Sequence, residues 1–303
     1  MKRITLVLGI IFFTATVRSE EGAAFLKLGT GARAAAMGGA YTALGDDASS
    51  IGWNPAGLAR LEKREFNAAH AELHERTRLD FATYAHPTEK GTFAAALLYL
   101  SHGSFTGRDG AGRPTGSVTA SDAAITGAYA RKTEFADVGV GLKFITSHIA
   151  EAEARTAAFD FGFKRQVYEL NGGKVLAAVA VRNLKAGPGL SYNGGQSSEL
   201  PLQFAAGTAW VSEKGSASFD LLNGPYGSGT DAAFGGEYRA LKGCALRAGY
   251  ATASTIGGGD GFDAARGLSF GVGVGKEGLS VDYAITPSGA LGSAHRFGLG
   301  YKF

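Results

Sequence analysis

The chain has one cysteine, two methionines and no apolar run as long as a membrane-spanning helix. With Cys244 alone, no intrachain disulfide can form, and we interpret this residue as a structural thiol in a strand. The longest apolar run, residues 4–17, is shorter than the ~20 residues that a transmembrane helix needs. Any membrane-embedded part of the chain must therefore be a β-barrel, because only helices and closed barrels satisfy every backbone polar group in lipid.

The chain also lacks a large excess of basic or acidic residues. The formal net charge is +3, but three of the 30 basic residues are Lys2, Arg3 and Arg18, and the other 27 balance 27 acidic residues. A neutral chain gives no argument for a nucleic-acid partner. Lys2 and Arg3 precede the apolar run, and a small residue follows at Ser19. We therefore predict a secretory signal peptide over residues 1–19.

The last eight residues have the pattern of a closing barrel strand. Phe297, Leu299, Tyr301 and Phe303 fall on one face, and the positions between them fall on the other. This period of two suits a strand with lipid on one side and a polar lumen on the other. The glycine spacing and the terminal aromatic residue resemble the signal that bacterial barrel-assembly machinery recognises. We predict an assembly signal made by Gly298, Tyr301 and Phe303.

Similar alternation continues from residue 63 to the C-terminus and predicts a transmembrane barrel over residues 63–303, in contact with the lipid of the bacterial outer membrane. An even strand number is expected of a closed antiparallel barrel. Short and long connections alternate along the chain, as they should when short turns face the periplasm. The fourteen expected strands are 64–73, 77–86, 92–102, 121–131, 136–148, 154–165, 174–184, 201–211, 217–222, 231–240, 244–252, 267–275, 279–285 and 294–303.

Charged residues recur on the face of these strands that opposes the apolar one. We expect them to point into the lumen and to pair with one another. A role in holding an inserted segment is favoured over a role in conduction. The residues of this expected lumen charge network are Asp122, Lys143, Asp160, Lys164, Arg182, Glu237, Arg247, Asp282 and Arg296.

Residues 20–62 differ in kind from the barrel. They read as short helices and turns, with Asp47 as a helix cap and Asn54-Pro55 as a stop, because the residue before proline disfavours helical geometry. Apolar side chains such as Phe25 and Trp53 need burial, and the barrel lumen is the natural place. We predict a hatch, or plug, with Asn54, Pro55, Ala56 and Gly57 as its structural turn. A periplasmic extension packed under the barrel is the alternative.

Motifs for catalysis, cofactors or metals are weak. The glycines at 29–34 imitate a dinucleotide fingerprint but lack a βαβ unit. A single calcium-type repeat at 258–263 cannot build a β-roll. Ser101-His102 and Ser147-His148 are sequence neighbours, which places their side chains on opposite faces of a strand. We expect no catalytic residues, no cofactor and no metal, and a protein that is not an enzyme.

Several stretches resemble the PorV/PorQ family. In the N-terminal part they are residues 22–29, 36–44 and 46–58, and the Asn54-Pro55-Ala56 turn is shared more widely with FadL-like fatty-acid transporters. Downstream the resemblance continues at 120–122, 182–184, 200–201, 236–238, 246–250 and 282–297. It implies an all-β, 14-stranded antiparallel FadL-like transmembrane β-barrel with a small N-terminal helical hatch, in agreement with the strands counted from alternation.

The resemblance implies two functions, and a purely structural or adhesive barrel is a third. The favoured one is an accessory or shuttle in type IX-like protein secretion, with a secretion translocon and secreted cargo proteins as partners. Its outer loops, 103–120 and 185–200, would meet those partners. The alternative is passive transport of a hydrophobic ligand such as a fatty acid. In that case the Gly-rich strand 267–275 could mark a kink beside a lateral opening.

Overall fold

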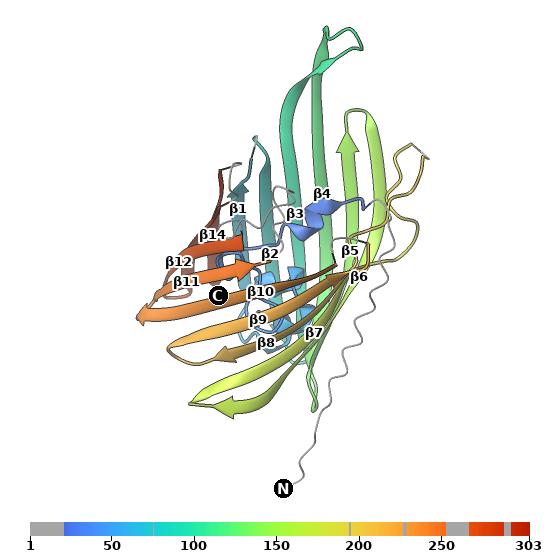
Figure 1. Ribbon diagram of the computed structural model, residues 1–303. Helices are drawn as coiled ribbons and strands as arrows, with labels where there is room; N and C mark the ends of the chain where they lie inside the picture. The colour runs from blue at the N-terminus through green and yellow to red at the C-terminus, as the bar shows by residue number, and fades with distance from the viewer. Residues whose placement is uncertain (1–20, 75, 194, 227–228, 253–266, 288–291) are drawn as a thin grey trace.

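The computed structural model describes residues 21–74, 76–193, 195–226, 229–252, 267–287 and 292–303, and these form a closed barrel of fourteen antiparallel strands (Figure 1). Each strand pairs with its neighbours in sequence, and β1 closes the ring on β14 with Glu65 opposite Lys302. The strands are β1 (Glu65–Glu72), β2 (Arg78–Thr88), β3 (Gly91–Arg108), β4 (Pro114–Lys132), β5 (Asp137–Ile149), β6 (Ala152–Leu170), β7 (Gly173–Lys185), β8 (Gln203–Val211), β9 (Gly215–Gly224), β10 (Gly229–Leu241), β11 (Cys244–Ala251), β12 (Leu268–Lys276), β13 (Leu279–Pro287) and β14 (Ser293–Lys302). The predicted strand number and antiparallel closure are confirmed.

Side chains alternate between the two faces of the wall. In β6, Phe159, Phe161 and Phe163 are 37–44% exposed on the outside, while Asp160 and Lys164, which alternate with them, are at most 5% exposed inside. The outward apolar face is the belt that lipid requires, and the inward polar face lines a lumen. A closed antiparallel barrel with such a belt is the fold of bacterial outer-membrane proteins, and it places this chain in that membrane.

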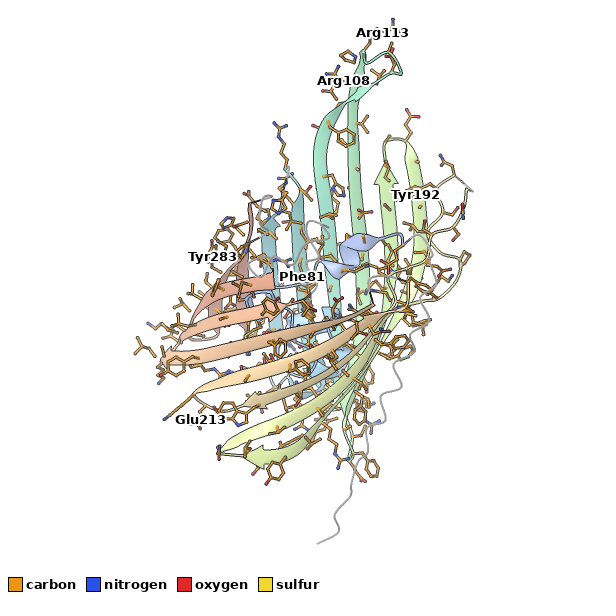
Figure 2. All side chains as sticks on the ribbon, in the orientation of Figure 1. Phe81, Arg108, Arg113, Tyr192, Glu213 and Tyr283 are labelled. Atoms are coloured by element: carbon orange, nitrogen blue, oxygen red, sulfur yellow. The ribbon has the colours of Figure 1, made fainter. Side chains whose placement is uncertain are left out.

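One pair of strands is much longer than expected. The segment 103–120, predicted as an outer loop, is mostly strand, because β3 continues to Arg108 and β4 begins at Pro114. The two strands project far beyond the rest of the rim as a ribbon (Figure 1). Figure 2 places Arg108 and Arg113 at its tip, at the opposite end of the molecule from Glu213 in the β8–β9 turn. The short turns lie at the Glu213 end, which is therefore the periplasmic end.

Short helices precede the barrel. They are η1 (Ala24–Lys27), α1 (Ala32–Ala36), η2 (Ala48–Gly52) and η3 (Pro55–Arg60). Residues 21–62, which we call the N-terminal segment, contact strands on every side of the ring: η3 packs on β3 to β6, η2 on β1 to β3, and α1 on β11 to β14. The segment therefore lies within the barrel. None of the helices in the described ranges is long and apolar enough to cross a membrane.

The connection between β7 and β8 also turns inward. Leu190 and Leu200 are at most 2% exposed, and the Gly22 N–H donates to the carbonyl oxygen of Glu199 at 2.8 Å. Part of the loop 185–200, expected to be free for partners, is instead packed over the start of the N-terminal segment. Residues 1–20, including the expected signal peptide, lie outside the described residues.

Candidate functional site

Glycines on the inner wall allow the N-terminal segment to approach the strands closely. A Cβ atom on Gly162 would lie 1.9 Å from Asn54 Oδ1, and one on Gly139 would lie 2.4 Å from the Pro55 carbonyl carbon. Contacts this short exclude any side chain at either position without displacement of the segment. The wall and the N-terminal segment are therefore matched at these positions.

The Gly-rich strand β12 follows the same principle. A Cβ on Gly271 would lie 2.5 Å from Ala36 Cβ. β12 pairs with β11 and β13 without a register shift over the paired residues. The kink expected for 267–275 is not observed, and at Gly271 the need for glycine is explained by the close approach of α1.

The predicted turn at Asn54–Gly57 lies at the centre of this packing. The Asn54 side chain accepts a hydrogen bond from Ala56 N at 3.0 Å and donates one to the Thr42 carbonyl oxygen at 2.9 Å. η2 ends at Gly52, before the proline, as expected. However, Asn54 also caps η3 and Pro55 is the first residue of that helix, a position where its missing N–H costs nothing. The motif thus starts a helix as well as ending one.

An arginine that the sequence analysis missed joins the N-terminal segment to the wall on the periplasmic side. Arg33 donates from Nε to Glu237 Oε2 at 2.9 Å and from NH1 to Asp46 Oδ1 at 2.6 Å. Glu237 also accepts from Arg247 Nε at 2.8 Å, and Arg247 NH1 lies 2.6 Å from Asp282 Oδ1. We call this chain of ion pairs the Arg33 network.

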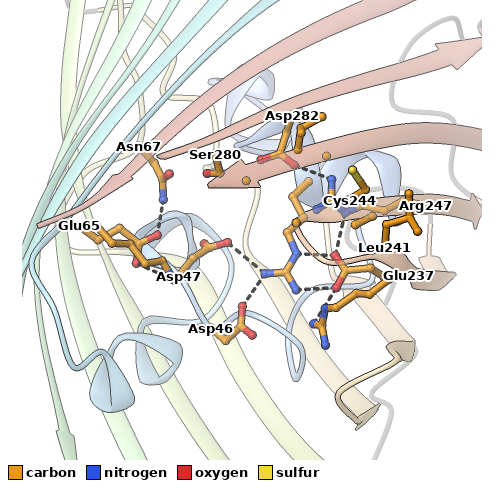
Figure 3. Close-up of a pocket in the computed structure, with 18 residues that line it drawn as sticks. Asp46, Asp47, Glu65, Asn67, Glu237, Leu241, Cys244, Arg247, Ser280 and Asp282 are labelled. Carbon is orange, nitrogen blue, oxygen red and sulfur yellow. Dashed lines mark hydrogen bonds and ion pairs between the residues drawn. The ribbon is translucent and has the colours of Figure 1, made fainter. Parts of the chain in front are cut away.

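The Arg33 network borders a cavity of about 340 Å³ at the periplasmic end, which we call the inner cavity (Figure 3). Its other lining residues include Glu65, Asn67 and Lys302, so its walls are largely polar. Exposed ion pairs contribute little to stability, but a bidentate arginine bound to a buried carboxylate is stronger and directional. The Arg33–Glu237 pair is of this second kind, since Glu237 is 5% exposed.

The nine charged residues expected to form one network all lie on the inner face, but the structure does not connect them into one. Glu237, Arg247 and Asp282 belong to the Arg33 network, and Lys143 pairs with Asp160 at 3.1 Å. The other four meet uncharged partners: Asp122 accepts from Ser147, Lys164 donates to the Gly45 carbonyl, Arg182 donates to Gln203, and Arg296 donates to the Leu28 and Gly29 carbonyls. Two of these four residues, Lys164 and Arg296, meet backbone carbonyls of the N-terminal segment, which alternation along a strand cannot reveal.

A second carboxylate that sequence reasoning missed is Asp220 on β9. Its Oδ2 accepts from the backbone N–H groups of Tyr41 and Thr42 at 2.9 and 2.8 Å, and the side chain is 0% exposed. The alternation of β9 places Asp220 at an inward position, which is a sequence signal for a lumen-facing charge. The groups that pair with Asp220 are backbone N–H groups, so no residue of opposite charge in the sequence indicates the contact.

A larger cavity of about 620 Å³, the outer cavity, lies on the other side of the N-terminal segment. Its apolar wall comes from Phe25 and Leu28 of the segment and from Leu73, Leu100 and Ile149 of the barrel. This volume is within the range of about 300–1,000 Å³ that is typical of ligand pockets. The N-terminal segment thus separates a mainly apolar outer cavity from a polar inner one.

One side of the outer cavity carries polar groups. Ser147 Oγ donates to Asp122 Oδ1 and lies 2.6 Å from the Tyr192 hydroxyl, while His102 Nε2 is 3.7 Å from Asp122 Oδ2. Figure 2 shows Tyr192 in the connection after β7, near the outer end. In a serine hydrolase the histidine stands between the serine and the carboxylate. Here the carboxylate stands between them, so no histidine in the described part of the chain is positioned as a base for Ser147.

The residues of the predicted assembly signal lie on β14, or directly after it, on both faces of the wall. Tyr301 and Phe303 are exposed outside, with ring centroids 4.9 Å apart. Gly298 faces inward, where an added Cβ would lie 3.1 Å from Ala32 Cβ. The glycine therefore also has a packing reason, in addition to any recognition by assembly machinery.

The fold and these two cavities define the class: a fourteen-stranded outer-membrane barrel with a filled lumen. A family model described as an uncharacterised protein family (UPF0164) matches residues 13–157. A search of curated protein sequences found no match.

Solved structures with a similar fold include two toluene transporters and a hydrocarbon channel. They are the toluene transporter TbuX of Ralstonia pickettii (14% identity, TM-score 0.62, covering 91% of this chain and 98% of that one), the toluene transporter TodX of Pseudomonas putida (13%, 0.64, 90% and 98%) and the CymD monoaromatic hydrocarbon channel (12%, 0.58, 91% and 98%). At sequence identities of 12–14%, the similarity shows that the fold is shared.

Proposed function

We propose that this protein is a passive transporter of small hydrophobic molecules across the outer membrane, and that the N-terminal segment is its hatch. The observation that carries the proposal is the outer cavity, whose apolar wall is shared between that segment and the barrel. A ligand seated there contacts the element that blocks the lumen. The names of the similar structures, toluene transporters and a monoaromatic hydrocarbon channel, support the same class of cargo.

In this proposal the hatch is held differently on its two sides. Toward the outside it packs through apolar side chains such as Phe25, which is 3% exposed. Toward the periplasm it is tied by the Arg33 network, where Asp46 is half exposed to solvent. The partly solvated Arg33–Asp46 pair breaks at a low free-energy cost of about 0–1 kcal/mol, whereas the buried Arg33–Glu237 pair is the stronger contact. Passage therefore begins with ligand in the outer cavity and ends with release of contacts around Arg33. No chemical step is involved.

Two measurements test the proposal. Planar-bilayer recordings should show a closed barrel for the intact protein and large, stable conductance after deletion of 22–62. Uptake of labelled toluene by cells should fall when Ala120→Trp fills the outer cavity. Ala217→Trp, on the lipid-facing side of β9, is the matched control and should leave uptake unchanged. Equal uptake by both variants would contradict the transporter proposal.

A second candidate function is an accessory of the PorV/PorQ type in type IX-like secretion. It is supported by the sequence resemblance and by the β3–β4 ribbon, which presents Phe105 at 51% exposure beyond the rim. Shortening the ribbon by removing 104–117 should abolish crosslinking to a secretion translocon or cargo in native membranes and leave the barrel folded. Occurrence of such a translocon in the same genome is the first observation to make. Toluene uptake that survives the deletion, with no partner lost, favours the transporter.

A further inference from the structure

The outer cavity has an uneven distribution of charge. Its lining includes two carboxylates, Glu21 and Asp122, and three histidines, His74, His102 and His148, but none of its described lining residues is lysine or arginine. Glu21 forms an ion pair with Lys27. Asp122 is thus the carboxylate in this lining that has no lysine or arginine paired with it in the described structure.

Asp122 keeps hydrogen-bonding capacity toward the cavity. Its Oδ1 accepts from Ser147. Its Oδ2 lies 3.7 Å from His102 Nε2, too far for an ordinary hydrogen bond. An ionised carboxylate has about four acceptor positions, so at least one remains for a donor from outside the protein.

A second group in the same lining, His74, has a nitrogen without a hydrogen bond in the described part of the chain. His74 Nε2 is a buried atom without a hydrogen-bond partner among the described residues. Buried polar atoms are nearly always paired, so this one leaves unused hydrogen-bonding capacity in a residue of the lining. An imidazole nitrogen can donate or accept, and a hydroxyl group can meet it in either state.

We propose that the outer cavity selects small hydrophobic molecules that carry a hydrogen-bond donor, such as phenols and aromatic alcohols, and rejects carboxylates. This inference rests on the transporter function proposed above and names its substrate class. The hydrocarbon part of the ligand lies against Phe25, Leu28 and Leu100, and its O–H donates to Asp122. A fatty acid or benzoate brings a second negative charge to Asp122, with no lysine or arginine among the described lining residues to neutralise it, and desolvating that pair is unfavourable.

Three probes of matched shape separate these contributions: 4-ethylphenol, ethylbenzene and 4-ethylbenzoate, titrated into the purified protein in detergent at pH 7.5 by calorimetry. A hydrogen bond to a charged group contributes enough to strengthen binding by roughly tenfold or more. We expect 4-ethylphenol to bind at least about tenfold more tightly than ethylbenzene, and 4-ethylbenzoate to bind most weakly. Heat-modifiable migration on gels confirms that each sample is folded.

Asp122→Asn removes the charge and keeps the shape. It should narrow the gap between 4-ethylphenol and ethylbenzene to a few fold and strengthen 4-ethylbenzoate binding. Ser147→Ala leaves the Asp122 charge in place and should still reject 4-ethylbenzoate, which keeps the test decisive if Asp122→Asn does not fold. Asp109→Asn, at the tip of the β3–β4 ribbon, is the matched control and should match the wild type.

The outcomes are distinct. Equal binding of the three probes, or tightest binding of 4-ethylbenzoate, overturns the inference and leaves the transporter function standing. A full preference for 4-ethylphenol in folded Asp122→Asn overturns the assignment of Asp122. If folded protein binds none of the probes, the transporter function itself fails.

Discussion

Replacement of Asn54 by alanine tests how the N-terminal segment is held in the lumen. The change removes the acceptor that caps η3, which costs about 0.5–2 kcal/mol. It also leaves the buried carbonyl oxygen of Thr42 without its donor, which costs about 1–3 kcal/mol. Both losses act on one short stretch of chain, so together they should destabilise the segment by roughly 2–4 kcal/mol.

The expected effect is local. Hydrogen exchange followed by mass spectrometry in detergent should show the amides of 21–62 exchanging roughly 30-fold to 1,000-fold faster in Asn54→Ala, because each 1.4 kcal/mol changes the open population tenfold. Peptides from β8 and β9 should exchange as in the wild type, since the barrel hydrogen bonds are untouched. Unchanged exchange across 21–62 would refute the structural role of the turn.

A coupled variant sharpens the test. In Gly162→Ala the new Cβ would lie 1.9 Å from Asn54 Oδ1, so this variant alone should also loosen the segment. In the double variant the carboxamide is gone and most of the added methyl group fits in the space it leaves, although Ala56 N remains 2.9 Å away. The effects of the two changes should therefore be less than additive, as for residues in direct contact. Full additivity would show that the two positions do not touch.

Three further predictions concern other parts of the barrel. Deletion of Phe303 should slow assembly and lower the amount of heat-modifiable protein in the outer membrane, because the closing strand loses its terminal aromatic residue; unchanged abundance would argue against the assembly signal. Gly139→Ala should speed hydrogen exchange in 21–62 whereas Gly127→Ala, on the next strand with nothing within 4 Å of the new Cβ, should not; equal effects would contradict the close-approach explanation. Backbone N–H groups of Arg113 and Ala111 donate to Asp109 and hold its pKa below the ordinary value. These hydrogen bonds should therefore order the ribbon tip above about pH 4 and be lost as the pH falls further. A spin label on the tip should gain mobility in acid, and Asp109→Asn should show that mobility already at pH 7.

The strands inside the membrane were predictable because two different solvents act on their two faces. Lipid outside and polar contacts inside impose a period of two, as in Phe159 to Lys164 of β6. Beyond the membrane the same rule does not apply. The ribbon after residue 101 has water on both faces, so Ser104 to Arg108 show no alternation and were predicted as a loop, although β3 continues through them.

The burial of the N-terminal segment could be predicted from the sequence, but the wall residues that it contacts could not. Its apolar residues indicated burial, and Met37, Ile51 and Trp53 are at most 8% exposed. These residues join clusters with apolar wall side chains such as Phe81 and Ala178, whereas other parts of the segment approach wall glycines, which carry no complementary side chain. Gly139, Gly162 and Gly271 are therefore understood only once the segment is seen against them.

Arg33 shows which sequence signal was overlooked. It stands among alanines in a stretch whose neighbours indicate burial in the lumen, and a buried arginine needs carboxylate, carboxamide or carbonyl oxygens to accept from its N–H groups. Asp46 and Asp47 follow in the same segment, and Glu237 occupies an inward position of β10. The sequence analysis gave the inward charges partners on other strands, as Glu237 has in Arg247, and overlooked the second cation, Arg33, in the segment that fills the barrel. For a barrel with a filled lumen, the charges of the wall and of the inserted segment must therefore be balanced as one set.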